Sequence, residues 1–182
     1  MEVELRPIVA TDWPRVHEWG SAPEACRFQV WGPNTEDETE AFVFACARTW
    51  DDPDGTRRVW AAEDPASGVI GIGELKVHDP VHRQGEISYA VHIDLWRRGI
   101  GERIARGLLE HAFVARQLHR VVATCDPRNV ASARVLQKLG MTYEGRMRHT
   151  LLLRDGWRDS DVYSMLETDD EAARRSAATR GS

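Results

Sequence analysis

Hydrophobic and polar positions alternate with a period of two in several short stretches of the chain, which is typical of β-strands with one buried face. The first stretch runs from Glu2 to Val9. Three more lie in the middle of the chain, and breaker-rich turns separate them. These predicted strands span roughly residues 57–63, 69–78 and 85–93 and form an antiparallel meander.

Apolar residues recur every three or four positions elsewhere, which indicates amphipathic helices. A short helix is predicted to end near Trp19, and Thr35 with Glu38 forms a capping-box pattern for a second helix that ends near Trp50. A long helix is predicted over residues 99–116. Another is predicted over residues 129–139, where Gly140 ends it.

The β-branched run Val121–Thr124 predicts a buried strand over residues 119–126, directly after the long helix. The order strand, helix, strand over residues 85–126 therefore predicts a central βαβ crossover. A hairpin over residues 141–153 and 157–167 completes the prediction. It is an α+β fold: a mixed, mostly antiparallel sheet of about seven strands with helices on both faces. We expect one domain over residues 1–168 and a flexible polar tail over 169–182.

Composition narrows the class of protein. With 182 residues, 42% of them hydrophobic, the chain can bury one core. No apolar run approaches 18 residues and the N-terminus lacks the pattern of an export signal, so we expect a cytoplasmic protein with no membrane contact. The net charge of −5 argues against a nucleic-acid partner. Three widely spaced cysteines, an odd number, indicate neither a disulfide framework nor a zinc site. We expect no metal at His78 and His82, because Asp79-Pro80 lies between them.

The segment Trp96–Arg103 carries the clearest chemical pattern. Gly99 and Gly101 lie where a predicted strand leads into the long helix. Glycine lets the backbone approach a bulky ligand, and the first amides of a helix have no partners within it. Arg97, Arg98 and Arg103 could add charge-assisted contacts to phosphates. The segment fits a pyrophosphate, although a tight turn flanked by solvated arginines explains it equally well. A nucleotide P-loop is excluded because no Gly-Lys-Ser/Thr follows.

These residues resemble a known family. Trp96-Arg97-Arg98-Gly99-Ile100-Gly101 is similar to the Gln/Arg-x-x-Gly-x-Gly/Ala motif of the GNAT acetyltransferase superfamily, with Trp96 in place of the first residue. Further matches are Glu86-Ile87-Ser88-Tyr89, Asn129-Val130-Ala131-Ser132 with Leu139-Gly140-Met141, and the closing hairpin from Tyr143 to Ser164. The resemblance is to the Rim-type branch, whose members acetylate the N-termini of ribosomal proteins. It covers about residues 5–166 and is weakest over 13–60.

The resemblance implies a GNAT fold and acetyl-CoA as cosubstrate. The pantetheine arm would lie between splayed strands and pair with the backbone of Val91, His92 and Ile93, and one of these amides would hold the oxyanion. Asn129 would also contact that arm. The pyrophosphate would lie on the backbone of Gly99, Ile100, Gly101, Glu102 and Arg103.

The resemblance also places Ser132 near the thioester sulfur, where it would protonate the departing thiolate. Ser132 lies three residues after Asn129, on the same helix face. The superfamily's more usual acid is a tyrosine seven residues after the asparagine, and that position holds Leu136. A serine that only bonds to the backbone is the alternative.

Glu74 is the candidate base. A period of two places it on the face of Ile70 and Ile72, where partial burial would make it a better proton acceptor. Glu86 and Asp126, near strand ends, are rivals, and a surface or paired role remains open for each of the three. An α-amine is already partly unprotonated at neutral pH, so a modest base or a chain of water molecules would serve.

We therefore predict an acetyl-CoA-dependent N-acetyltransferase that acetylates a primary amine, either a protein N-terminus or a small molecule, by direct attack in a ternary complex. No cysteine stands at a nucleophile position. The alternative is a catalytically idle acyl-CoA-binding sensor or scaffold, which would need Gly99, Gly101 and Asn129 but not Ser132. A homodimer is left open. The N-terminal tryptophans favour core packing over an aromatic acceptor pocket; they are Trp13, Trp19, Trp31 and Trp50.

Overall fold

A computed structural model describes residues 2–170, which form a seven-stranded sheet in the order β1-β2-β3-β4-β5-β7-β6. Neighbouring strands are antiparallel except β4 and β5, which are parallel. This confirms the mixed sheet, the meander and the crossover that the sequence predicts. The strands are β1 (Glu4–Pro7), β2 (Arg57–Asp64), β3 (Gly68–Asp79), β4 (Gln84–Val91), β5 (Arg120–Cys125), β6 (Thr142–Leu153) and β7 (Gly156–Leu166).

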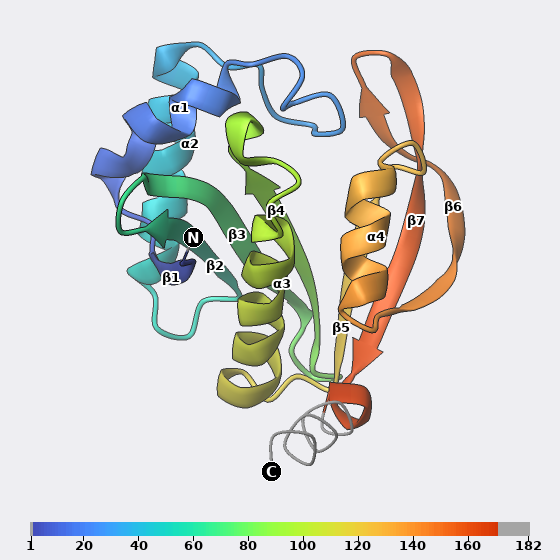
Figure 1. Cartoon of the computed structure of the whole chain (residues 1–182). Coiled ribbons are helices and arrows are strands. Elements are labelled where there is room, and N and C mark those ends of the chain that lie inside the picture. The colour runs from blue at the N-terminus through green and yellow to red at the C-terminus, as the bar shows by residue number, and fades with distance from the viewer. Residues whose placement is uncertain (1, 171–182) are drawn as a thin grey trace.

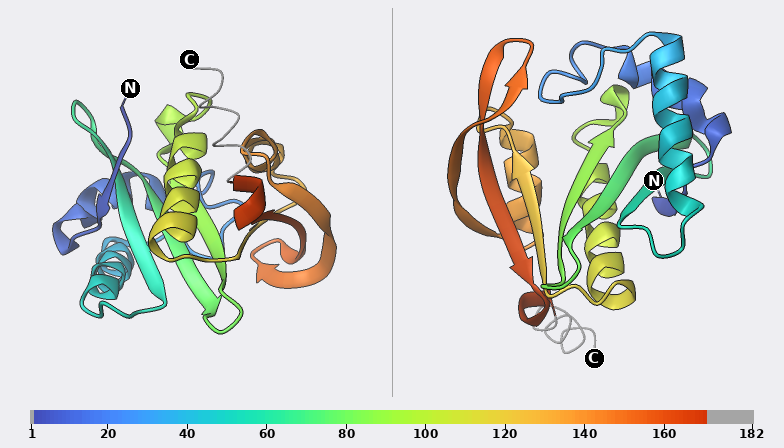
Figure 2. Two further views of the ribbon diagram at one scale, coloured as in Figure 1. Left: turned by 90° about the horizontal axis from the view of Figure 1, so that it is seen from below. Right: turned by 180° about the vertical axis from the view of Figure 1, so that it is seen from behind.

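Helices cover both faces of the sheet (Figure 1). α3 and α4 lie on one face; α1 and α2 lie on the other, over the half that contains β1 to β3 (Figure 2). The helices are α1 (Trp13–Gly20), α2 (Glu36–Ala47), α3 (Ile100–Glu110) and α4 (Val130–Lys138), with 3-10 turns η1 (Ala10–Asp12), η2 (Arg48–Trp50) and η3 (Ile93–Leu95). No helix of the described part is long and apolar enough to cross a membrane.

Local sequence explains where these helices begin. The Thr35 Oγ1 accepts a hydrogen bond from the Glu38 amide at 3.3 Å, and the Glu38 carboxylate accepts one from the Thr35 amide at 2.8 Å, so the expected capping box starts α2. The long predicted helix is α3 followed by one π-helical segment, η4 (His111–Ala115). Residues 167–170 are helical, although we expected a loose tail from residue 169; residues 171–182 of that tail lie outside the described part.

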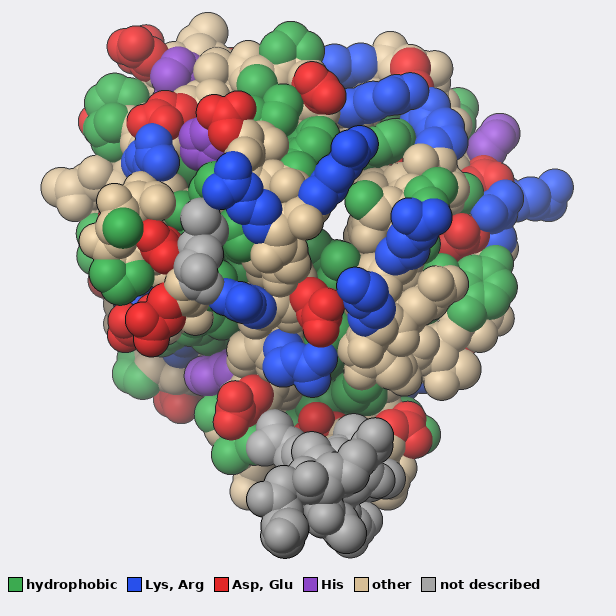
Figure 3. Space-filling view, in the orientation of Figure 1, with side chains coloured by type: hydrophobic (Ala, Val, Ile, Leu, Met, Phe, Trp, Pro, Cys, Tyr) green, Lys and Arg blue, Asp and Glu red, His purple; other side chains and the backbone are tan. Residues whose placement is uncertain are grey.

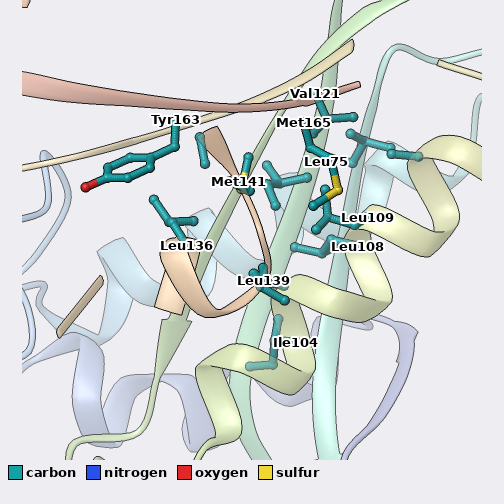
Figure 4. Packing of buried hydrophobic residues seen from close by; sticks show 14 of the residues in the cluster. Leu75, Ile104, Leu108, Leu109, Val121, Leu136, Leu139, Met141, Tyr163 and Met165 are labelled. Atoms are coloured by element: carbon teal, nitrogen blue, oxygen red, sulfur yellow. The ribbon is translucent and has the colours of Figure 1, made fainter. Parts of the chain in front are cut away.

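Two cores fill the space between sheet and helices. The α3-side core contains the side chains of Leu75, Ile104, Leu108, Val121 and Tyr163, which meet between β3, β5, β7 and α3 (Figure 4). The α1-side core lies on the other face and joins α1 and α2 to β2 and β3. Its buried members are Ile8, Val16, Trp19, Val43, Cys46, Val59, Ala61, Val69 and Ile72.

A β-bulge on β3 changes the face on which Ile70 lies. Ala62 pairs with Gly71 while Glu63 pairs with Val69, so Ile70 is the extra residue. Ile70 belongs to the α3-side core and Ile72 to the α1-side core. Our expectation that both share one face with Glu74 is therefore wrong for Ile70, because simple alternation does not hold across a bulge.

β4 and β5 are paired over only three residues before they separate. The pairs are Gln84 with Arg120, Gly85 with Val121 and Glu86 with Val122. Beyond Glu86, β4 continues to Val91 beside β3, and β5 continues to Cys125 beside β7. An opening therefore divides the sheet at the ends of its two central strands.

Gly73 on β3 allows α3 to lie close to the sheet. A Cβ at this position would be 2.9 Å from Ile104 Cγ2 and 3.1 Å from Leu108 Cδ1. Overpacking of this kind costs about 1–3 kcal/mol. Replacing a strand glycine by alanine also stabilises the folded state by about 0.5–1 kcal/mol, because glycine loses more conformational freedom on folding; this offsets only part of the cost.

We predict that Gly73→Ala lowers the free energy of unfolding, because the added methyl group displaces α3. Urea denaturation at constant slope measures the change. Ser88→Ala, at an exposed position of β4, is the control and should stay within about 0.5 kcal/mol of the wild type. Equal midpoints for Gly73→Ala and wild type would show that the contact between α3 and β3 has room to spare.

Candidate active site

The opening between β4 and β5 passes through the molecule. Figure 3 shows it between the parts formed by α3 and α4, with Lys and Arg side chains gathered around it. The N-terminal ends of α3 and α4 both lie beside this opening (Figure 1). The loop between α1 and α2 (residues 21–35) crosses the same end of the molecule toward β7. The opening is thus bordered by two helix N-termini, whose amides carry partial positive charge.

The start of α3 presents backbone amides to a ligand. Gly99 is the N-cap residue, with φ of 75°, a left-handed conformation that glycine adopts without strain. The amides of Ile100, Gly101 and Glu102 follow and lack helix-internal partners because they belong to the first turn. Ile100 is buried, which fixes this turn on the core.

The charged side chains here divide into two groups. Arg97, Arg98 and Arg103 are exposed on the segment that leads into α3 and on its first turn. The Glu102 carboxylate bonds to Arg106 at 3.2 Å and lies 3.9 Å from Lys138 of α4. Glu102 is the acidic residue of the first turn, and these cations offset its negative charge. An anionic ligand at the first-turn amides is therefore repelled less.

At the end of β4, the backbone groups of Val91, His92 and Ile93 point in different directions. We expected all three to be available to the pantetheine arm. The His92 amide donates to the Ile70 carbonyl at 2.9 Å and so belongs to the β3 side. Because adjacent residues of a strand direct their backbone groups to opposite sides, the Val91 backbone faces the opening. The Val91 carbonyl accepts a hydrogen bond from Trp96 Nε1 at 3.0 Å. Ile93 begins the turn η3, which takes the chain away from the sheet.

Trp96 replaces the first Gln/Arg of the motif, and its hydrogen bond to Val91 suggests why an indole is suitable. It ties the end of β4 to the segment that leads into α3. The distance between the two backbone surfaces that a ligand would contact is thereby fixed.

Asn129 and Ser132 lie at the first turn of α4. The Asn129 Oδ1 accepts a hydrogen bond from the Ser132 amide at 3.1 Å, so this side chain caps α4 and leaves Nδ2 as its group for a ligand. The Ser132 hydroxyl lies 3.3 Å from the Tyr89 hydroxyl of β4. Leu136, one turn later, is buried in the α3-side core.

Tyr89 connects the three parts of the site. Its ring lies against Gly101, where a Cβ would be 3.1 Å from Tyr89 Cε2. Its hydroxyl reaches Ser132, and its backbone belongs to β4. Burial raises the pKa of Tyr89 to about 12, against a smaller opposing effect of the Ser132 hydrogen bond. The phenol is therefore protonated at neutral pH and can donate a hydrogen bond.

Glu74 lies apart from this group. Its carboxylate makes two hydrogen bonds with Arg57, of 2.8 and 3.1 Å. Glu74 pairs with Ser88 across β3 and β4, three residues before Val91, which is about 10 Å along the strand. The structure thus brings Tyr89, Gly101, Asn129 and Ser132 together and leaves Glu74 in an ion pair elsewhere.

The rival carboxylates are also engaged. Asp126 is 1% exposed and accepts hydrogen bonds from the Arg128 amide and guanidinium. Burial acts to raise the pKa of Asp126, but the bonds from Arg128 outweigh it and hold the pKa below its usual range. Glu86 accepts a hydrogen bond from the Thr124 hydroxyl at 3.2 Å, at the closed end of the opening.

The remaining candidates have structural contacts. His82 bonds to Asp79 at 2.8 Å, and no cluster of three His, Cys, Asp or Glu side chains within residues 2–170 could hold a metal ion. Trp19 is buried and packs on the His92 ring, and Trp50 packs on Trp60. Trp31 stacks on Phe42, with an interplanar angle of 10°.

Comparison with known proteins identifies the family. The model of the acetyltransferase (GNAT) domain matches residues 2–142, which include β1 to β5 and the start of both α3 and α4. The chain belongs to the GNAT acetyltransferase family. The fold and the family resemblance predicted from the sequence are therefore confirmed.

Three relatives show how this GNAT chain compares. The uncharacterized N-acetyltransferase YnaD of Bacillus subtilis is 28% identical over 163 residues, 90% of this chain and 92% of YnaD. YdaF of the same organism, whose name proposes a ribosomal N-acetyltransferase, is 30% identical over 100 residues, 55% of this chain and 53% of YdaF. The crystal structure of spermidine N-acetyltransferase from Vibrio cholerae, in complex with CoA and spermine, has a TM-score of 0.78 at 18% identity and covers 92% of this chain and 96% of that one. At that identity the likeness shows the fold alone.

Sequence reasoning used Tyr89 only as part of a strand motif and missed its contact with Ser132. Alternation along β4 offers a signal: Tyr89 shares a face with Ile87, which is buried in the α3-side core. A large polar ring on that face, opposite a glycine on the next helix, needs a hydrogen-bond partner, and Ser132 is one.

We predict that Tyr89 makes stability depend on pH in alkaline solution. Because its pKa is higher in the folded protein than in the unfolded chain, its contribution is complete below about pH 10 and declines as pH rises toward 12. Urea midpoints between pH 9 and 12 should fall more steeply for the wild type than for Tyr89→Phe. Parallel curves for the two proteins would contradict the burial of this phenol.

Proposed function

We propose that this GNAT protein is an acetyl-CoA-dependent N-acetyltransferase that acetylates a primary amine by direct attack in a ternary complex. The separation of β4 and β5 beside the N-terminus of α3 is the observation that supports it most. It combines, at one opening, backbone groups for an extended ligand and first-turn amides for a diphosphate. Family membership supports acetyl transfer in general.

The chain offers contacts for the pyrophosphate, the pantetheine arm and the thioester of acetyl-CoA. The amides of Ile100, Gly101 and Glu102 would bind the pyrophosphate, with Arg97, Arg98 and Arg103 around it. The pantetheine arm would lie along the Val91 side of β4, and Asn129 Nδ2 would bond to it. Since the His92 amide is bonded to Ile70, the Val91 amide is our choice for the oxyanion of the tetrahedral intermediate.

The chemistry needs one proton donor and one proton acceptor. The amine nitrogen attacks the thioester carbonyl, a C–N bond forms, and the C–S bond then breaks. Ser132 would give its proton to the departing thiolate, and the Tyr89 phenol would hold the serine hydroxyl in place. The proton that water takes from the attacking amine would then return to Ser132, so that the proton lost by the amine equals the one gained by the thiolate. Tyr89 acts here as a positioning residue.

The attacking amine must lose a proton as well. Glu74 is paired with Arg57, and Asp126 is held by Arg128, so neither is placed as a poised base. We propose that the proton passes to water. This route suits an α-amine, with a pKa of about 7.7–8.0, better than a lysine-like amine with a pKa of about 10.4.

We predict that Ser132→Ala lowers kcat by about 100-fold, the lower range for loss of a general acid, with little change in acetyl-CoA affinity. Thiol release from acetyl-CoA, with a panel of peptides and small amines, measures turnover; calorimetry measures binding. Ser88→Ala, on the opposite face of β4, is the matched serine control. An unchanged kcat would remove Ser132 from the acid role. If no amine produced thiol above the hydrolysis background, the idle acyl-CoA-binding alternative would replace our proposal.

We predict that Gly101→Val abolishes acetyl-CoA binding. A branched side chain at this position would meet the Tyr89 ring and cover the first-turn amides. Calorimetry with acetyl-CoA measures the loss, and circular dichroism checks that the helix content is retained. Val114→Ala, at an exposed position beyond the end of α3, is the control and should bind normally. Full binding by folded Gly101→Val would place the pyrophosphate elsewhere.

A further inference from the structure

Arg158 on β7 is a buried cation with an unused donor. Its side chain is only 8% exposed. Nη1 donates to the Phe28 carbonyl at 3.3 Å and Nη2 to the Ser160 hydroxyl at 2.7 Å. Nε is buried and has no hydrogen-bond partner within the described residues. Buried polar atoms are nearly always hydrogen-bonded, so an unpartnered guanidinium N–H needs an explanation.

The sheet register places Arg158 at the open end of the gap between β4 and β5. The pairing of Glu86 with Val122 makes Val91 level with residue 127. The pairing of Cys125 with Asp161 makes Arg158 level with residue 128. Arg158 is therefore level with the end of β4, one strand beyond β5. Its bond to Phe28 places the guanidinium under the loop between α1 and α2.

The nearby carboxylates are bound to other groups. Arg158 bonds to a carbonyl and a hydroxyl, both neutral oxygens, while Asp126 is held by Arg128 and Glu86 by Thr124. Burial lowers the pKa of the Arg158 guanidinium, and the charges of Asp126 and Glu86 only partly offset this. The site thus holds a desolvated cation that lacks a bonded anion.

The loop contact distinguishes Arg158 from its neighbour Arg154. Arg154 also donates to this loop, to the Gln29 carbonyl at 3.4 Å, but its side chain is exposed. Holding the loop therefore does not require a buried arginine. The burial of Arg158 and its unused Nε are features that a loop contact alone does not explain.

We propose that Arg158 determines acceptor specificity by binding an oxygen on the carbon next to the carbon that bears the amine. The acceptors selected would be α-amino compounds whose neighbouring group is a carbonyl or a carboxylate. Simple amines and polyamines lack that oxygen, and the positive charges of a polyamine would be repelled by the buried guanidinium. The inference rests on the proposed function, because it assumes that the acceptor amine reaches the open end of the gap.

The test compares alaninamide with propargylamine, whose amine pKa values are similar, and adds alanine and spermidine, whose amines are more basic. Alaninamide has the carbonyl, and propargylamine is a small amine without oxygen. Alanine replaces the carbonyl with a carboxylate, and spermidine is the polyamine. Thiol release gives kcat/KM for each, expressed per unprotonated amine, in the wild type, in Arg158→Gln and in the control Arg154→Gln.

We expect the wild type to favour alaninamide over propargylamine by roughly 10- to 100-fold, the range for a hydrogen bond to a charged group. Arg158→Gln should reduce that ratio to about 1 with unchanged acetyl-CoA affinity, whereas Arg154→Gln should keep it. A higher kcat/KM for alanine than for alaninamide would identify the oxygen as a carboxylate, and the reverse would identify it as a carbonyl; either supports the proposal.

Other outcomes overturn the inference. Equal wild-type kcat/KM for alaninamide and propargylamine, or a preference for spermidine, would exclude the role of Arg158 and leave acetyl transfer intact. These measurements use the wild type alone, so they stand even where Arg158→Gln fails to fold. An unchanged ratio in folded Arg158→Gln would likewise exclude it. No thiol release with any amine would overturn the proposed function itself, and this inference with it.

Discussion

The site depends on two parallel strands that are hydrogen-bonded at one end and held apart at the other. β4 and β5 share three residue pairs, and beyond them each strand is bound to a different neighbour. Backbone groups that face a gap must find partners. One of them, the Val91 carbonyl, is satisfied by Trp96, and Tyr89 with Ser132 bridges the gap between β4 and α4. The opening is thus a built feature with its own side-chain supports.

Electrostatics at the opening follows from the same arrangement. The N-termini of α3 and α4 lie beside it, so partial positive charge is concentrated where a thioester carrier would bring its diphosphate. Glu102 pairs with Arg106 and Lys138, and Asp126 pairs with Arg128. Pairing therefore offsets acids at the opening, even though the whole chain has a net charge of −5. Net charge describes the protein's solution behaviour, whereas binding depends on this local distribution.

Periodic patterns predicted the elements well because each pattern is a local property. The capping box of Thr35 with Glu38 and the apolar stripe of α3 are written in neighbouring residues. The face of Ile70 could not be predicted, since a bulge is defined by pairing with another strand. The same limit applies to the site: the motif indicated Gly99, Gly101 and Ser132, but the Tyr89 contact and the bonding of Glu74 to Arg57 arise from residues far apart in the chain.

The engaged carboxylates and the buried Arg158 guanidinium both bear on which acceptor the site would select. A site without a poised carboxylate base works best on amines that are partly unprotonated at neutral pH, and an α-amine beside a carbonyl is such an amine. The electron-withdrawing carbonyl that lowers the amine pKa is also the group that the proposed contact with the Arg158 guanidinium requires. One acceptor chemistry would therefore account for both the engaged Glu74 and Asp126 carboxylates and the buried guanidinium, whereas a polyamine has more basic amines and offers Arg158 no oxygen.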